Sequence, residues 1–261
     1  MKKMNRALRL LGYLVVVLAV VAMLGFVESS KSVAVCEGME IEFLGGDSVR
    51  LITENDVRQT ILSKVGEPVG MNLRGIDFDG MEELLRSLPH LRHVAVYSTV
   101  DQHVRVEIEQ RKPMVRLLDR NGNSAVVDCE GVIMPVPNAA VLRLPVFTGD
   151  FGLTQEQIDQ NFPITDTTAT LALMNAYEFG RCIKGDSFAQ AQFQHMVMEK
   201  NGNLTAYPQV GNHTIIFGKN DFEEKLRRLK IFYREGMTAN NWNKYSSINL
   251  KYKNQIVCTK K

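Results

Sequence analysis

Residues 94–109, VAVYSTVDQHVRVEIE, decide how the first water-soluble part of this chain folds. Apolar and polar residues alternate here on both sides of a turn near 101–102, and the apolar members are Val94, Val96, Val104, Val106 and Ile108. A period of two with a single apolar face is typical of strands that bury one side of a sheet. We therefore expect two strands of an antiparallel sheet, with helices on its buried face and water on the other.

Two helical patterns precede these strands. The first opens with a capping box at 53–56, in which the Thr53 hydroxyl can accept an early backbone amide, and continues with helical spacing over 57–65. The second runs over 78–88 and stops at Pro89. With a short alternating strand at 41–44 in front, the expected order is β-α-α-β-β.

An uncharged apolar run, LLGYLVVVLAVVAMLGFV at 10–27, stands ahead of this domain. As a helix it spans roughly 27 Å, close to the ~30 Å hydrocarbon core of a bilayer. The basic residues Lys2, Lys3, Arg6 and Arg9 precede it, which places the N-terminus in the cytoplasm by the positive-inside rule. We predict a cytoplasmic tail (1–9), a transmembrane helix (10–27) and a linker (28–38). The alternative is a cleaved signal peptide, whose apolar region is usually shorter, ~7–15 residues.

Composition is that of a folded exported domain, with 45% hydrophobic and 23% charged residues. The chain has 31 basic and 29 acidic residues, so without the four basic residues before the apolar run 27 oppose 29. A formal charge of −2 on the exported part argues against a nucleic-acid partner. The cysteines are far apart in sequence and predict no disulfide framework. They are Cys36, Cys129, Cys182 and Cys258.

The second half of the sequence predicts a β-rich domain with flanking helices. Asn-Gly pairs at 121–122 and 201–202 predict two hairpins. Helical patterns cover 167–179, with Gly180 as the expected end, and 221–235, where Lys225 and Arg228 are expected outside the apolar stripe. Further strands are expected at 193–198, 204–207, 213–217 and 245–252, the last followed by a short apolar stretch at 256–258.

Four stretches of this sequence are distinctive: LITENDV (51–57), LPHLRHV (88–94), VRVEIEQRKP (104–113), which ends in a motif like I-x-E/Q-R-x-P, and Asp128-Cys129-Glu130-Gly131. Through these stretches the chain resembles the FtsQ/DivIB family of bacterial cell-division proteins. This resemblance implies an α+β protein: after the membrane helix, a POTRA-like (polypeptide-transport-associated) domain over 39–112, then an FtsQ-type β domain over 113–261.

The resemblance extends to the C-terminal stretch YSSINLKY at 245–252, which is similar to the family's I-D-L-R-Y strand. Asn249 stands where that pattern has aspartate, and Lys251 stands where it often has arginine, whose bidentate contacts a lysine cannot reproduce. We expect this strand to be the sheet edge, where unpaired N–H and C=O groups can accept a partner's strand. In the family, FtsB and FtsL dock in this region. The partner-binding residues so implied are Tyr245, Ser247, Asn249, Leu250, Lys251, Tyr252 and Ile256. The alternative is an edge protected by its own lysines, without a partner.

Signatures of catalysis are missing from the sequence: it has no GxSxG, HExxH, phosphate-binding loop or dinucleotide fingerprint. His90 and His93 flank the start of a strand and, even with His103 nearby, make an incomplete zinc ligand set. We predict no catalytic, metal or cofactor site.

The resulting hypothesis is a non-enzymatic, single-pass scaffold of the division septum, with its folded domains outside the plasma membrane. It would link early and late division proteins by binding FtsB/FtsL-type partners, and its POTRA-like domain would meet other division or wall-synthesis proteins. Two alternatives stay open. One is an anchored cell-wall glycan hydrolase, whose two carboxylates can lie far apart in sequence. The other is a different POTRA-containing transport or assembly factor.

Overall fold

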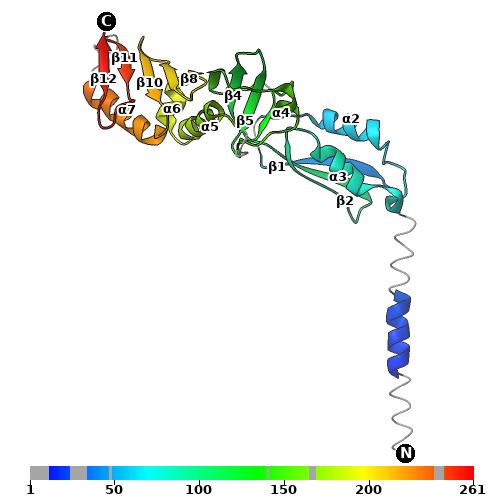
Figure 1. Cartoon of the computed structure of the whole chain (residues 1–261). Helices are drawn as coiled ribbons and strands as arrows, with labels where there is room; N and C mark the ends of the chain where they lie inside the picture. The colour runs from blue at the N-terminus through cyan, green and yellow to red at the C-terminus, as the bar shows by residue number, and fades with distance from the viewer. Residues whose placement is uncertain (1–11, 24–33, 47–48, 140, 165–168, 238–243) are drawn as a thin grey trace, which may run out of the picture. The chain divides into compact units, whose positions relative to one another are not determined.

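The computed structural model describes residues 12–23, 34–46, 49–139, 141–164, 169–237 and 244–261 (Figure 1). The chain divides into two compact units. The first comprises residues up to Asp47 and Thr53–Glu109, and the second comprises Ser48–Ile52 and Gln110–Lys261.

The predicted membrane segment is described only in part. Residues 12–23 are helical and their side chains are exposed, whereas 10–11, 24–27 and the tail at 1–9 lie outside the described residues. Within the described ranges, no helix is both long and apolar enough to cross a bilayer. The transmembrane anchor therefore stays a prediction.

The first unit has the predicted β-α-α-β-β order, with one added 3₁₀ turn. Its elements are β1 (Gly38–Leu44), α2 (Glu54–Lys64), η1 (Leu73–Gly75), α3 (Phe78–Arg86), β2 (Leu91–Ser98) and β3 (His103–Gln110). The capping box is confirmed: the Asp56 amide donates to the Thr53 hydroxyl at 3.1 Å, and the Thr53 amide donates to the Asp56 carboxylate at 3.0 Å.

The strand order of this sheet is β1-β3-β2, and it corrects the expectation of a purely antiparallel sheet. β1 runs parallel to β3, with Ile41 opposite Val106. The segment between β1 and β3, which contains both helices and β2, is the long connection that a parallel pair needs. Alternation in 94–109 shows which face of each strand is buried, but it does not show in which direction a neighbouring strand runs. The core contains buried residues from both helices and all three strands: Met39, Val57, Ile61, Met81, Leu85, Val94, Val104, Val106 and Ile108.

The second unit is built on one nine-stranded sheet in the order β12-β11-β10-β9-β8-β7-β4-β5-β6. The strands are β4 (Pro113–Asp119), β5 (Ser124–Asp128), β6 (Ile133–Pro135), β7 (Val146–Gly149), β8 (Phe193–Met198), β9 (Leu204–Pro208), β10 (Thr214–Gly218), β11 (Tyr245–Asn249) and β12 (Val257–Lys260). The helices are α4 (Gln155–Asp159), α5 (Leu171–Lys184), α6 (Ser187–Gln192) and α7 (Phe222–Gly236). Both predicted Asn-Gly hairpins are confirmed, as β4–β5 and β8–β9.

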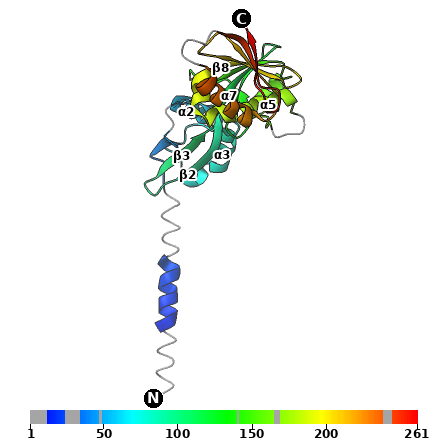
Figure 2. The same ribbon diagram turned by 90° about the vertical axis from the view of Figure 1, so that its left-hand side faces the viewer.

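Helices α5, α6 and α7 lie along one face of this sheet (Figures 1 and 2). Side chains on that face, such as Leu117, Phe147, Met196 and Ile215, belong to one core cluster with residues of these helices. On the opposite face, polar and aromatic side chains such as Thr148, His195 and Tyr207 are partly or fully exposed. Over β7, β8 and β9 the sheet therefore buries one face. At β5 and β6 the opposite face is covered as well, because Val126 and Met134 form a second buried cluster with Leu51 there.

Two predictions about the helices of this unit are wrong. Helix α5 continues through Gly180 to Lys184, because a Cβ at position 180 would lie 2.6 Å from Val115 Cγ1 and the glycine allows the helix close to β4. Lys225 is not outside the apolar stripe but buried, since its ammonium reaches the carbonyls of Lys219 and Asn220 in the turn before α7. Helices α4 and α6 are too short for the periodicity of the sequence to predict.

Candidate functional site

The predicted partner-binding strand is not the edge of the sheet. β11 lies between β10, which runs parallel to it with Ile215 opposite Ile248, and β12, which runs antiparallel with Cys258 opposite Ile248. The expectation that 245–252 forms the edge is therefore wrong. The chain turns back after Leu250 and adds one more strand of its own, and β12 takes the edge position.

Hydrogen bonding shows which groups of β12 face outward. The Leu250 amide donates to the Ile216 carbonyl of β10, and the Lys261 amide donates to the Lys244 carbonyl before β11. Because amides alternate in direction along a strand, those of Val257 and Thr259 point toward β11. The amides of Cys258 and Lys260 consequently point away from the sheet. Among the described residues, no strand pairs with that outer side.

The sheet's other edge is closed. Beyond β6, the Ile133 amide donates to the Phe162 carbonyl at 2.9 Å, and the Ile164 amide donates to the Gly131 carbonyl at 2.8 Å. This segment thus pairs with the β6 edge, whereas the β12 edge has no such cover in the described part of the chain.

The seven predicted binding residues fall into three environments. Leu250 is 0% exposed and belongs to the core, so its side chain is not accessible to a partner. Tyr245, Ser247, Asn249 and Ile256 are half-buried, and Lys251 and Tyr252 are exposed.

Tyr245 and Ser247 both contact neighbouring elements of the second unit. The ring of Tyr245 lies 6.0 Å from that of Phe232 on α7. Ser247 Oγ donates to Thr259 Oγ1 of β12 at 3.0 Å, so β11 holds β12 with side chains as well as backbone.

The connector between β11 and β12 is fastened to α7 by Arg228. Its guanidinium donates to three backbone carbonyls, those of Leu250 at 3.2 Å, Tyr252 at 2.9 Å and Gln255 at 3.4 Å. The Lys251 amide donates to Asn249 Oδ1 at 3.0 Å, and Asn254 has a left-handed φ of 59°. The connector is therefore a compact turn, and its position decides where β12 begins. Sequence reasoning missed both β12 as the edge and Arg228 as the residue that holds it. The only signal for β12 is the short apolar stretch at 256–258.

Few of the described side chains are arranged as a catalytic or metal-binding site would need. Among the residues that the structure describes, no group of three or more histidines, cysteines or carboxylates could hold a metal ion. All four cysteines are free thiols, and burial raises the pKa of the Cys258 thiol on β12. His103 stands at the start of β3, its Nδ1 2.9 Å from the Asp101 carbonyl oxygen, and His93 is an exposed residue of β2.

Comparison with known proteins agrees with this architecture. Residues 112–259, more than half of the chain, match the family described as FtsQ/DivIB, C-terminal related, and residues 34–109 match a POTRA-like domain. A relative from Rhodothermus marinus, named cell division protein FtsQ, is 27% identical over 160 residues. That match covers 59% of this chain and 55% of the relative, so the chain spans about half of that protein's length. The chain therefore belongs to the FtsQ/DivIB family.

Proposed function

We propose that the protein is a non-enzymatic, membrane-anchored scaffold of the division septum that captures a strand of an FtsB/FtsL-type partner along the outer side of β12. One observation carries the proposal: the amides of Cys258 and Lys260 point outward from a sheet edge with which no described strand pairs. An exposed edge of this kind offers main-chain hydrogen bonds to an added strand, and neighbouring side chains give it specificity.

The accessible side chains for this role lie around the edge and its connector. Tyr252 in the connector is 54% exposed, and Val257 at the start of β12 is 43% exposed, so both offer accessible apolar area. Of the residues first assigned to partner binding, Tyr245, Ser247, Asn249, Lys251, Tyr252 and Ile256 remain in the proposed contact surface. Leu250 contributes through the core that supports the strand.

The proposed anchor, residues 10–27, would confine the protein to the plasma membrane with both folded units on its outer side. Partners held in the same membrane meet at a high effective concentration, so modest interfaces suffice for assembly. The POTRA-like unit would contact other division or wall-synthesis proteins.

A proline substitution tests the strand-capture proposal. Lys260→Pro removes an outward amide without removing an amide that donates to β11, and proline is tolerated on edge strands in that orientation. The matched control, Lys260→Ala, keeps the amide. We expect co-purification of an FtsB-type partner with the full-length protein from membranes to fail for Lys260→Pro and to persist for Lys260→Ala. Equal capture by both variants would refute pairing at this edge. Tyr252→Glu tests the side-chain contact in the same assay, and retained capture would remove Tyr252 from the interface.

A further inference from the structure

The amine of Lys184 and the thiol of Cys129 are in direct contact, although the two residues are 55 positions apart in the chain. Cys129 lies in the turn between β5 and β6, and Lys184 is the last residue of α5. The ammonium donates a hydrogen bond to the sulfur, with Nζ 2.5 Å from Sγ. Two nucleophilic side chains are thus brought together by the fold of the second unit.

Hydrogen bonds on both sides of this pair hold the turn against the helix. The backbone amide and the thiol of Cys129 both donate to the carbonyl of Lys112, at 3.0 and 3.1 Å. The Tyr177 hydroxyl of α5 donates to the Cys129 carbonyl at 3.2 Å. Tyr177 and Lys184 are about two helical turns apart, so both lie on the face of α5 that meets this turn. The contact therefore lies in an ordered junction between the turn and the helix.

Small reagents in solution can reach this pair, because Lys184 is exposed and Cys129 is half-buried. Cys36 is only 1% exposed. The Cys258 thiol stays protonated at neutral pH, since burial raises its pKa. Among the residues that the structure describes, Cys129 is the one cysteine to which a cation donates a hydrogen bond. A cation in contact with a cysteine offsets the charge of its thiolate, which is the nucleophilic form.

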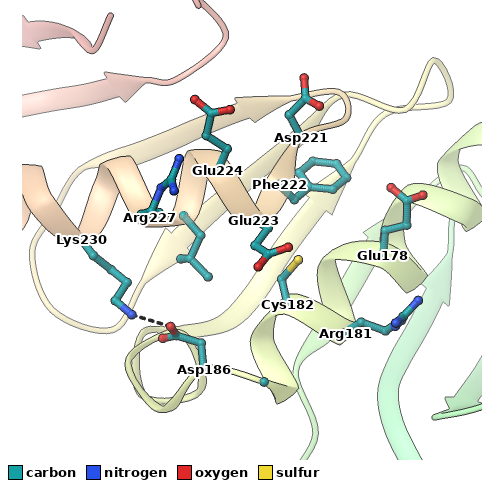
Figure 3. Close-up of a pocket in the computed structure, with 12 residues that line it drawn as sticks. Glu178, Arg181, Cys182, Asp186, Asp221, Phe222, Glu223, Glu224, Arg227 and Lys230 are labelled. Atoms are coloured by element: carbon teal, nitrogen blue, oxygen red, sulfur yellow. Dashed lines mark hydrogen bonds and ion pairs between the residues drawn. The ribbon is translucent and has the colours of Figure 1, made fainter. Parts of the chain in front are cut away.

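Cys182 is the closest comparison, because it lies on the same helix as Lys184 and is half-buried like Cys129. Side chains two positions apart on a helix point in different directions, and Cys182 faces α7, beside Glu223 (Figure 3). Burial raises the pKa of its thiol, and the carboxylates of Glu223 and Glu178 raise it further. Cys182 therefore stays protonated at neutral pH and is an internal reference for Cys129.

We propose that Cys129 and Lys184 form a redox-sensitive cross-linking site, in which a peroxide oxidises the sulfur and an S–N bond then joins the two side chains. The Cys129 thiolate attacks one oxygen of hydrogen peroxide, the O–O bond breaks, and a sulfenic acid and a hydroxide ion result. The hydroxide takes one proton from the Lys184 ammonium and becomes water.

The second step forms the cross-link. The neutral amine of Lys184 attacks the sulfenic sulfur, the S–O bond breaks, and the departing oxygen leaves as water with one proton of the amine. The product is a sulfenamide. The sulfur has lost two electrons, and the peroxide has been reduced to two waters.

The bond would close residues 129–184 into one loop and fasten the turn after β5 to the end of α5. Closing a loop restricts the unfolded chain, so the bond opposes separation of the turn from the helix. A thiol reductant would reverse it by attack on the sulfur. The site depends neither on strand capture at β12 nor on the anchor at 10–27.

Peptide mass spectrometry of the full-length protein tests the cross-link. The protein is treated with hydrogen peroxide and digested with trypsin without a reductant. We expect a joined pair of peptides, one with Cys129 and one with Lys184, whose mass is the sum of the two less two hydrogen atoms. Trypsin does not cleave at a modified lysine, so the second peptide should continue past Lys184. Dithiothreitol before digestion should abolish the joined species.

Three variants assign the atoms of the bond. Lys184→Arg keeps a cation beside the thiol, but a guanidinium is a poor nucleophile. The joined species should therefore be lost, while dimedone, a reagent for sulfenic acids, should label Cys129. Cys182→Ser should retain the joined species, and it is needed because a disulfide between Cys129 and Cys182 would have the same mass. Lys112→Arg is the matched control, since it changes a neighbouring amine but not the carbonyl that holds Cys129, and it should retain the joined species.

The proposal is overturned if Lys184→Arg still forms the joined species, or if Cys182→Ser loses it. It is also overturned if the wild type yields no joined species, whether or not dimedone labels Cys129. Oxidation of Cys182 or Cys258 as fast as that of Cys129 would overturn it too, because the lysine would then not select the thiol that reacts.

Discussion

Nη1 of Arg228 on α7 donates a hydrogen bond of 2.9 Å to the backbone carbonyl of Tyr252, an exposed residue of the β11–β12 connector. The same guanidinium reaches the carbonyls of Leu250 and Gln255. β12 itself is only four residues long and, among the described strands, pairs with β11 alone. The edge proposed to accept a partner is therefore ordered by a helix on the covered face of the sheet.

Arg228→Lys tests this coupling. A lysine keeps the charge, but its compact ammonium cannot reproduce the fork of donors that spans three carbonyls. We expect the variant to lose about 1–2 kcal/mol of the connector's local stability, with faster amide hydrogen exchange over 250–261 and weaker partner capture. Arg234→Lys, at an exposed position on the same helix, is the control and should leave exchange unchanged. Unaltered exchange in Arg228→Lys would show that the connector does not need the guanidinium.

An ion pair joins the motif at 108–113 to the motif at 128–131, near the start of the second unit. Arg111, in the motif at 108–113, bonds the carboxylate of Asp128 at 3.0 Å, and that side chain is 2% exposed. The other carboxylate oxygen of Asp128 accepts the amides of Glu130 and Val132. A single aspartate thus fixes the turn after β5 and neutralises Arg111.

Asp128→Asn keeps an oxygen for those amides but leaves the Arg111 cation without its closest partner. Breaking a largely buried pair in this way should lower the free energy of unfolding by about 2–3 kcal/mol. Glu130→Gln is the matched control, because Glu130 lies 3.7 Å from the same guanidinium and its side chain is 47% exposed. It should cost no more than about 0.5 kcal/mol. Chemical unfolding of the full-length protein measures both, and equal costs would contradict the assigned role of Asp128.

For Gly180→Ala we predict a change in stability opposite in sign to the one that helix propensity alone would give. In an exposed helix, Gly→Ala gains about 1 kcal/mol, but a Cβ here would meet Val115 Cγ1 at 2.6 Å and Met114 Cε at 3.2 Å. We expect Gly180→Ala to destabilise the second unit by about 1–3 kcal/mol through overpacking. Gly75→Ala, where nothing lies within 4 Å, is the control. A stabilised Gly180→Ala protein in thermal unfolding would mean that α5 can move away from β4.

These residues show where prediction from the sequence succeeds and where it stops. The capping box at 53–56, the two Asn-Gly hairpins and helix α7 follow from residues close together in the chain, so local periodicity and turn chemistry predict them. The parallel pairing of β1 with β3 joins residues 65 positions apart, such as Ile41 and Val106, and no local pattern carries that information. In the sequence Gly180 looks like a helix end, because glycine commonly follows the last turn of a helix. Its actual role is to allow close packing against Val115, and a local sequence pattern does not show such a tertiary contact.

The prediction that residues 245–252 form the sheet edge failed because it, too, depends on pairing that the local sequence does not show. Residues 245–252 have the alternation of a strand, but whether a strand is internal depends on what pairs with it. β12 contributes only four residues, too few for alternation to be distinguished from chance. Arg228 and Lys225 look like members of a solvated charged face. Their guanidinium and ammonium groups instead bond backbone carbonyls, which are acceptors that a sequence pattern cannot display.

The capping box of α2 gives the clearest pH dependence. Hydrogen bonds from the Thr53 side chain, and then from the Thr53 backbone, lower the pKa of Asp56 below its ordinary 3.8. Since the folded pKa is the lower one, the unfolded chain binds the proton first as pH falls. The stabilisation is therefore complete above the ordinary pKa and is lost as pH falls through the folded value. Asp56→Asn should destabilise the first unit at neutral pH, and its difference from the wild type should shrink to zero at the acid end of that window. Unfolding measured along this pH series tests the prediction, with Thr53→Ala as the second variant because it removes the main donor while keeping the carboxylate. A cost of Asp56→Asn that stays constant across the series would mean that its charge does not stabilise the start of α2.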